Sequence, residues 1–216
     1  MSGKTMDPHP HRTSRQASVF IIGLTLAGLL LHCEILPARD SSPSTTGAPN
    51  LQTLFSRLAQ RKETRVRFVE TKTLSVLSQP LKQQGTLEFQ PPGMLAKHVD
   101  KPQEEHYVIE GSRVTISKAG ESSEVQLNLS DYPALEAFAE GLRAPLAGDL
   151  ETLHRYWKPS LGGSWRRWLL ILTPLSPELA TLIRSVRLEG QDDRLIRMTL
   201  EETGGDHSTL DFMPVP

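Results

Sequence analysis

The chain has 216 residues, with 24 lysines and arginines against 25 aspartates and glutamates, so its formal net charge is −1 at pH 7. This length is enough for one sizeable domain with a hydrophobic core of its own. The balanced charge, and the lack of a dense basic cluster interleaved with aromatic residues, argue against a protein that binds nucleic acid or another polyanion.

The first 38 residues have the features of a secretory signal peptide. A leader containing histidines and arginines precedes a mainly apolar stretch of 15 residues, 17–31, and Leu36-Pro37-Ala38 follows it. A membrane-spanning anchor needs roughly 20 apolar residues, so the shorter stretch fits an exported protein better. We predict a signal peptide over residues 1–38 with cleavage after Ala38; the alternative is an uncleaved signal anchor.

Cys33 is the single cysteine of the chain and lies within this signal peptide. The mature domain is therefore expected to depend on its packed core and not on disulfides. The segment Leu30-Leu31-His32-Cys33 also has some features of a lipoprotein-processing box, in which the cysteine is acylated. That box requires a small residue immediately before the cysteine, and His32 is bulky. Acylation at Cys33 is therefore the secondary interpretation.

The composition changes after the signal peptide. Residues 39–50 are rich in Ser, Thr, Pro and Gly, and this composition predicts a disordered linker. The folded domain is then predicted over residues 51–216. It opens with apolar residues at helical spacing in the segment 51–59, which indicates an amphipathic helix.

Three more helices are predicted in the second half. The first begins at Ser130 or Asp131, and the second covers about residues 147–156. Ser176-Pro177-Glu178 has the order of a cap, a first-turn proline and a first-turn acid, and it predicts a short helix that ends near Ile183.

The segment 65–116 shows the period-two alternation of side chains that is typical of half-buried antiparallel strands. Val66, Phe68, Glu70 and Lys72 fall on one side of a first strand that is expected to reach Val76. Strands of about ten residues span roughly 33 Å and favour a curved sheet with an apolar concave face. The later strands are predicted at 85–89, 94–99, 106–110, 113–116, 125–129, 165–173, 186–189, 195–201 and 209–212.

No pattern in the chain predicts catalysis or metal binding. There is no Gly-x-Ser-x-Gly elbow, no thiol after cleavage and no glycine-rich loop that opens a helix. His98 and His106 can face each other across a hairpin, but two histidines without a third ligand are more often a packed pair than a metal site. We expect no catalytic residue, no metal and no cofactor.

Several short segments follow one another in an order that is specific when they are taken together. They are Phe68-Val69-Glu70, Gln84–Phe89, Pro92–Leu95, Tyr107–Ile116, the Trp168-x-Leu170-x-Leu172-x-Pro174 strand and the closing hairpin Leu195–Phe212. Over about residues 51–212 the chain resembles the outer-membrane lipoprotein carrier family (LolA-like), as a divergent branch.

The resemblance implies an α+β fold, a half-open antiparallel β-barrel with α-helices that cover its opening. It implies a periplasmic carrier, not an enzyme, that takes acyl chains toward the outer membrane. The implied partners are a lipidated protein or a glycolipid as cargo, an inner-membrane exporter and an outer-membrane acceptor, and the implied state is a monomer. Pro91 stands where such carriers have a basic residue that helps to hold the lid closed. The resemblance therefore does not decide between a lipoprotein and a glycolipid as the cargo. The alternatives are an outer-membrane-anchored acceptor acylated at Cys33 and a lipid-binding envelope sensor.

The predicted binding site consists of apolar residues on the concave face and on the covering helices. The cavity is predicted from Phe68, Leu74, Leu87, Phe89, Leu95, Leu170 and Leu172, and the lid from Leu54, Phe55, Leu135 and Phe138. Because no basic cluster converges on these positions, binding is expected to depend on apolar burial with little charge selectivity. Lys97 and His98 are expected on the rim.

Overall fold

The computed structural model describes residues 48–61, 65–91 and 93–214, and its main feature is one open antiparallel sheet of eleven strands. The strand order is β6-β5-β4-β3-β2-β1-β11-β10-β9-β8-β7, so the ends of the domain pair at the centre, β1 with β11. The strands are β1 Arg65–Thr73, β2 Leu81–Gln90, β3 Met94–Lys101, β4 Glu105–Glu110, β5 Arg113–Lys118, β6 Val125–Asn128, β7 Trp157–Ser164, β8 Arg167–Pro174, β9 Ile183–Gln191, β10 Arg194–Glu202 and β11 His207–Pro214.

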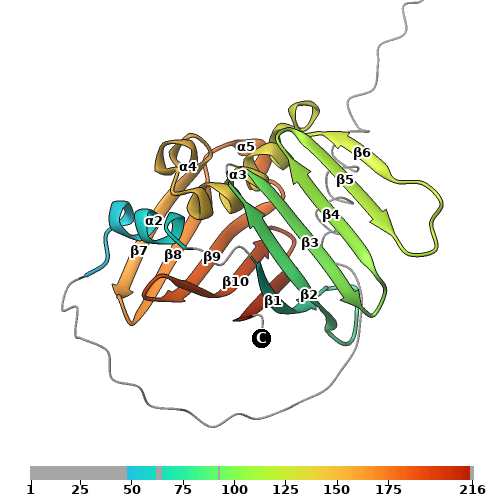
Figure 1. The fold of residues 1–216 in the computed structure, drawn as a ribbon, viewed down its shortest axis with the longest axis horizontal. Helices are drawn as coiled ribbons and strands as arrows, with labels where there is room; N and C mark the ends of the chain where they lie inside the picture. The colour runs from blue at the N-terminus through green and yellow to red at the C-terminus, as the bar shows by residue number, and fades with distance from the viewer. Residues whose placement is uncertain (1–47, 62–64, 92, 215–216) are drawn as a thin grey trace, which may run out of the picture.

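The sheet curves around its helices and does not close. Figure 1 shows two wings, β2–β6 and β7–β10, with α3 and α5 between their upper ends and with α2 and α4 on the side of β7 and β8. The helices are α2 Leu51–Ala59, α3 Pro133–Ala147, α4 Leu150–Tyr156 and α5 Pro177–Ala180. The predicted half-open barrel with covering helices is confirmed.

The helix boundaries follow from local caps. The side chain of Asn50 caps α2 by accepting from the backbone N–H of Thr53. Gly148, with φ of 73°, ends α3 in a left-handed conformation, and Asp149 caps α4 at once. The helix predicted from about residue 147 therefore begins three residues later.

Three strand predictions need correction. The first strand ends at Thr73 and does not reach Val76, which lies in the following turn and is exposed. The strand predicted from residue 165 begins at Arg167, after a turn. Strand β7 was not predicted, because Pro159 interrupts its sequence pattern; the structure accommodates this proline on an edge strand, where one ladder hydrogen bond is not needed.

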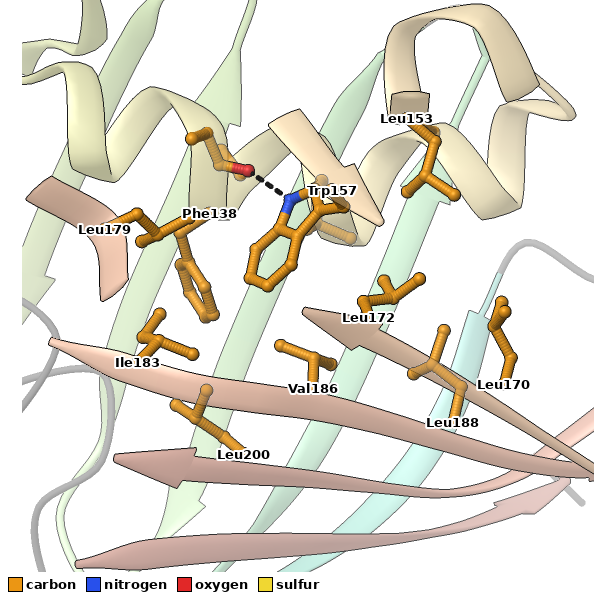
Figure 2. Close-up of a cluster of buried hydrophobic side chains, with 14 of the residues drawn as sticks. Phe138, Leu153, Trp157, Leu170, Leu172, Leu179, Ile183, Val186, Leu188 and Leu200 are labelled. Carbon is orange, nitrogen blue, oxygen red and sulfur yellow. Dashed lines mark hydrogen bonds between the residues drawn. The ribbon is translucent and has the colours of Figure 1, made fainter. Parts of the chain in front are cut away.

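The main core lies where the helices pack on β7–β10. The buried indole of Trp157 donates to the carbonyl of Ala137 at 2.8 Å, and this bond joins β7 to α3 (Figure 2). A Cβ at Gly141 would lie 2.5 Å from that indole, so only glycine permits this approach of α3. The other labelled side chains of this buried cluster in Figure 2 are Phe138, Leu153, Leu170, Leu172, Leu179, Ile183, Val186, Leu188 and Leu200.

None of the helices within the described residues is both long enough and apolar enough to cross a membrane.

Candidate functional site

A cleft runs between the helices and the concave face of the sheet. It consists of two pockets, which hold about 980 and 1050 Å³ of atom-free space, part of it open to solvent. The two pockets adjoin each other, because their linings share six apolar residues: Leu58, Leu87, Leu95, Leu146, Leu195 and Phe212. We call them the inner pocket and the outer pocket.

The inner pocket is walled mainly by apolar side chains from both layers. Helix α3 contributes four side chains and α2 contributes Leu58, while the opposite wall comes from strands β1–β4 and β8–β11. The apolar side chains from α3 and from β8–β11 are Phe138, Leu142, Pro145, Leu146, Trp168, Leu188, Leu195, Met198, Leu200, Leu210 and Phe212. This is the composition of a site for a long apolar group.

The outer pocket is the mouth of the cleft. Two large apolar side chains border it while more than 40% exposed, Ile196 and Met213. Charged residues also reach it, including Arg61, which donates to the backbone carbonyl of Asp193 at 3.2 Å and ties the end of α2 to the β9–β10 turn.

Arg143 holds α3 over the other wing of the sheet. Its side chain is mostly buried and donates to the carbonyls of Gly111 at 2.8 Å and Gly93 at 3.3 Å, and it also pairs with Glu140. Gly93 precedes β3 and Gly111 lies in the β4–β5 turn. An arginine of the covering helix therefore joins α3 to the start of β3 and to the β4–β5 turn.

The lining of the inner pocket also includes residues of a buried charged cluster. Glu70 of β1 is 1% exposed, and its carboxylate accepts from Lys97 Nζ at 2.6 Å and from the hydroxyl of Ser208. Lys72 Nζ lies 3.6 Å from the same carboxylate and donates to Gln83 at 3.1 Å. We call Glu70, Lys72, Lys97 and Ser208 the polar cluster.

A second buried pair adjoins the polar cluster. The hydroxyl of Tyr107 donates to Glu105 at 2.6 Å, and Lys118 lies 3.4 Å from the other oxygen of that carboxylate. Burial, together with this hydrogen bond, raises the pKa of Tyr107. Tyr107 lines the inner pocket beside three members of the polar cluster: Glu70, Lys97 and Ser208.

One prediction about charge is wrong. Lys97 does not lie on the rim; it is 6% exposed and lines the inner pocket. The expectation of little charge selectivity stays a prediction. Strand alternation already places Lys97 on the same face as Leu95 and Val99, but the anion that makes its burial tolerable, Glu70, comes from another strand.

Burial lowers the pKa of Lys72 from an ordinary 10.5 to about 7, and Glu70 only partly offsets this effect. Below about pH 7 the lysine is charged in both the folded and the unfolded chain, and the full cost of burying the charge is present. Between pH 7 and 10.5 only the unfolded chain keeps the proton, so stability rises with pH, by at most about 1.4 kcal/mol per unit.

We therefore expect the free energy of unfolding to increase by about 2 kcal/mol between pH 7.5 and 9.5. Urea denaturation at the two pH values measures it, and the Lys72→Met variant should not show the increase. The raised pKa of Tyr107 acts in the opposite direction only above about pH 10, where the unfolded tyrosine ionises first. A wild-type protein as pH-independent as Lys72→Met would contradict this account of the buried lysine.

The predicted pairing of His98 with His106 is confirmed on neighbouring strands. Their Nδ1 atoms are 2.7 Å apart, and His106 Nε2 lies 3.1 Å from Glu104. Burial and the neighbouring His106 lower the pKa of His98. No group of three metal-ligating side chains occurs in the part of the chain that the structure describes.

A family model described as outer membrane lipoprotein carrier protein LolA-like matches residues 44–210. The chain belongs to the LolA-like family. Among curated proteins, none matches it.

Solved structures of low sequence identity are similar to this LolA-like chain. The LolA superfamily protein NE2245 from Nitrosomonas europaea is 11% identical, covering 76% of this chain and 91% of the other, with a TM-score of 0.40. The Pseudomonas aeruginosa MucA/MucB complex has a chain that is 12% identical, with 76% and 56% covered and a TM-score of 0.40. An outer membrane lipoprotein-sorting protein domain from Vibrio parahaemolyticus is 8% identical, with 75% and 89% covered and a TM-score of 0.39.

The predicted cavity residues divide into two groups in this LolA-like chain. Leu87 and Leu95 line both pockets, and Phe89 lines the outer pocket. Four predicted cavity residues are buried without lining either pocket: Phe68, Leu74, Leu170 and Leu172. Of the predicted lid residues Phe138 lines the inner pocket, whereas Leu54, Phe55 and Leu135 lie in the core. The role of all of these in lipid binding stays a prediction.

The sequence prediction missed most of the wall that the closing strands provide. Leu195, Met198 and Phe212 were assigned to strands but not to the cavity, although the alternation of β10 and β11 was visible. On α3, Leu142 and Leu146 follow Phe138 at spacings of four residues, so the three side chains lie on one face of the helix. This spacing could have identified Leu146 as a lining residue from the sequence.

Proposed function

We propose that this protein is a periplasmic carrier that binds the acyl chains of a lipoprotein or a (glyco)lipid and ferries them toward the outer membrane. The observation that carries the proposal is the pair of adjoining, mainly apolar pockets between helices and sheet. Burying an acyl chain recovers about 0.8 kcal/mol per CH₂ group, so such a cleft can hold a chain in water that would otherwise stay in a membrane.

The mouth supports loading and release from the side of the domain. Ile196 and Met213 keep apolar surface exposed where a chain would enter. Polar contacts of Arg61, just after α2, and of Arg143, in the last turns of α3, help to hold these helices over the cleft. The partners proposed are an inner-membrane exporter that loads the cleft and an outer-membrane acceptor that empties it.

The carrier and the anchored acceptor differ at the N-terminus. Residues 1–47, with the predicted signal peptide, most of the linker and Cys33, lie outside the described residues. We expect a mature protein that begins near Arg39 and carries no acyl group, because His32 is too bulky for the processing box. Intact-mass measurement of protein purified from the cell envelope tests this. A diacylglyceryl-modified Cys33 at the N-terminus would instead identify the acceptor.

The cargo is identified by native mass spectrometry of the same purified protein. The proposal predicts a bound species that carries at least one long acyl chain and is lost when the cleft is blocked. Leu87→Asp is the blocking variant, and Thr86→Asp, on the opposite face of the same strand, is its control. A wild-type protein that never retains acylated material, under conditions where it is folded, would count against the carrier function.

A further inference from the structure

The polar residues that line the inner pocket all lie at the same depth in it. On each of the strands β1, β3, β4 and β11, one of them is the last lining residue, counted from the mouth: Glu70, Lys97, Tyr107 and Ser208. On the first three of these strands, the next residue on the same face is buried and lines neither pocket: Lys72, Val99 and Glu105. This polar row therefore marks the depth at which the pocket ends on these strands.

More buried polar side chains lie behind this row and bond to it. Lys72 donates to Gln83 at 3.1 Å and lies 3.6 Å from the Glu70 carboxylate, while Glu105 accepts from Tyr107 at 2.6 Å. Throughout the part of the chain that the structure describes, each buried side-chain nitrogen or oxygen has a hydrogen-bond partner. The polar groups therefore satisfy one another, and the row is a boundary of the pocket and not a binding site for a polar group.

Such a boundary resists a longer alkyl chain more strongly than an apolar boundary would. A chain that pressed past Glu70 and Lys97 would separate a buried ion pair and leave each charge without its partner, which is strongly destabilising. Methionine side chains in the same places could adapt to the chain by changing rotamer. Because apolar residues of similar size would stabilise the fold about as well as the ion pairs do, stability alone does not account for the polar row.

We propose that the polar cluster, together with Tyr107, forms an end wall that sets the longest alkyl chain the cleft can bury. This inference rests on the proposed function and adds a property of the cargo, its chain length, for which the cleft selects. The chain enters with its methyl end first and ends against this wall. On β11 the lining runs from Pro214 at the mouth to Ser208, which is roughly 20 Å along the strand. A longer chain leaves CH₂ groups outside the mouth.

The test is the affinity of single-chain phosphocholines as a function of chain length, from decanoyl to eicosanoyl chains. Displacement of a fluorescent acyl probe, below the aggregation concentration of each lipid, gives the affinity. For chains that the cleft can bury, each added CH₂ group should tighten binding about fourfold. We expect this gain to stop at a definite length within the series, because further CH₂ groups stay in water. A gain that continues through the whole series in the wild-type protein would overturn the inference.

A triple variant, Glu70→Leu/Lys72→Met/Lys97→Met, tests whether the charges set this limit. It should bind chains two CH₂ groups beyond the wild-type limit about 16-fold more tightly than the wild-type protein does. Arg197→Gln/Asp211→Asn, which removes an exposed charged pair from the outer face of β10 and β11, should leave the limit unchanged. A triple variant that is folded by circular dichroism and keeps the wild-type limit would overturn the inference while leaving the acyl-chain carrier in place. Failure of every phosphocholine to bind the wild-type protein would overturn the proposed function itself.

Discussion

Replacing Glu70 by leucine should lower the free energy of unfolding by about 3 kcal/mol, the loss typical of removing one partner from a buried ion pair. The carboxylate is the shared partner of Lys72 and Lys97, and neither ammonium can reach water without movement of the sheet. Deprotonation of Lys72 limits the loss, since its pKa is already about 7. Urea denaturation with a constant m-value measures the change.

Two comparisons make this result specific. Replacing Glu70, Lys72 and Lys97 together by leucine and methionines should restore most of the stability, because apolar residues replace a buried charge cluster at little cost. Glu151→Ala, which breaks the exposed pair with Arg155 on α4, should leave stability almost unchanged, because the pair is solvated. If Glu70→Leu costs no more than Glu151→Ala, the polar cluster is not the buried network described above.

The second large effect is expected on binding. Leu87 is half-buried and lines both pockets, so Leu87→Asp keeps a partly solvated carboxylate in the empty protein and buries it against a bound chain. Burying an uncompensated polar group costs at least about 2 kcal/mol, which corresponds to about a 30-fold loss of affinity.

Displacement of a fluorescent acyl probe measures this effect, with circular dichroism as the check on folding. Thr86→Asp is the matched control, since it adds the same charge to the adjacent residue on the outer face of β2. If the Leu87→Asp variant is folded and binds the probe as tightly as the wild-type protein does, the acyl chain is held elsewhere.

Residue alternation predicted much of the fold, because each strand has one face toward the helices. It placed Leu87 and Leu95 correctly toward the concave face, and it also put Glu70 and Lys72 on the same face as Phe68. What it could not supply was the pairing between distant strands. Glu70 is bonded to Lys97, 27 residues later in the chain, and to Ser208, 138 residues later. These long-range partners explain why a charged residue is buried where the sequence pattern alone suggests a solvated one.

The cavity was harder to predict than the core, for a related reason. Leu170 and Leu172 have the same alternation as Leu87, yet helices α3 and α4 cover the wing of the sheet to which they belong (Figure 2). Which inward side chains meet a helix and which meet open space depends on where α3 crosses the sheet. That crossing is set by the fit of Gly141 against Trp157 and by the tethers of Arg143, none of which has a local sequence pattern.

The central claim, that a long alkyl chain occupies the inner pocket, is tested most directly through Trp168. Of the three tryptophans only Trp168 lines the pocket, where it is 1% exposed and donates to the carbonyl of Asp192. A chain brominated along its length quenches indole fluorescence at contact, whereas the same chain without bromine does not. We predict saturable quenching by the brominated chain that is greatly reduced in Trp168→Phe and unchanged in Trp165→Phe. Quenching that persists in Trp168→Phe, or that is absent while the chain binds, would contradict a ligand in this cleft.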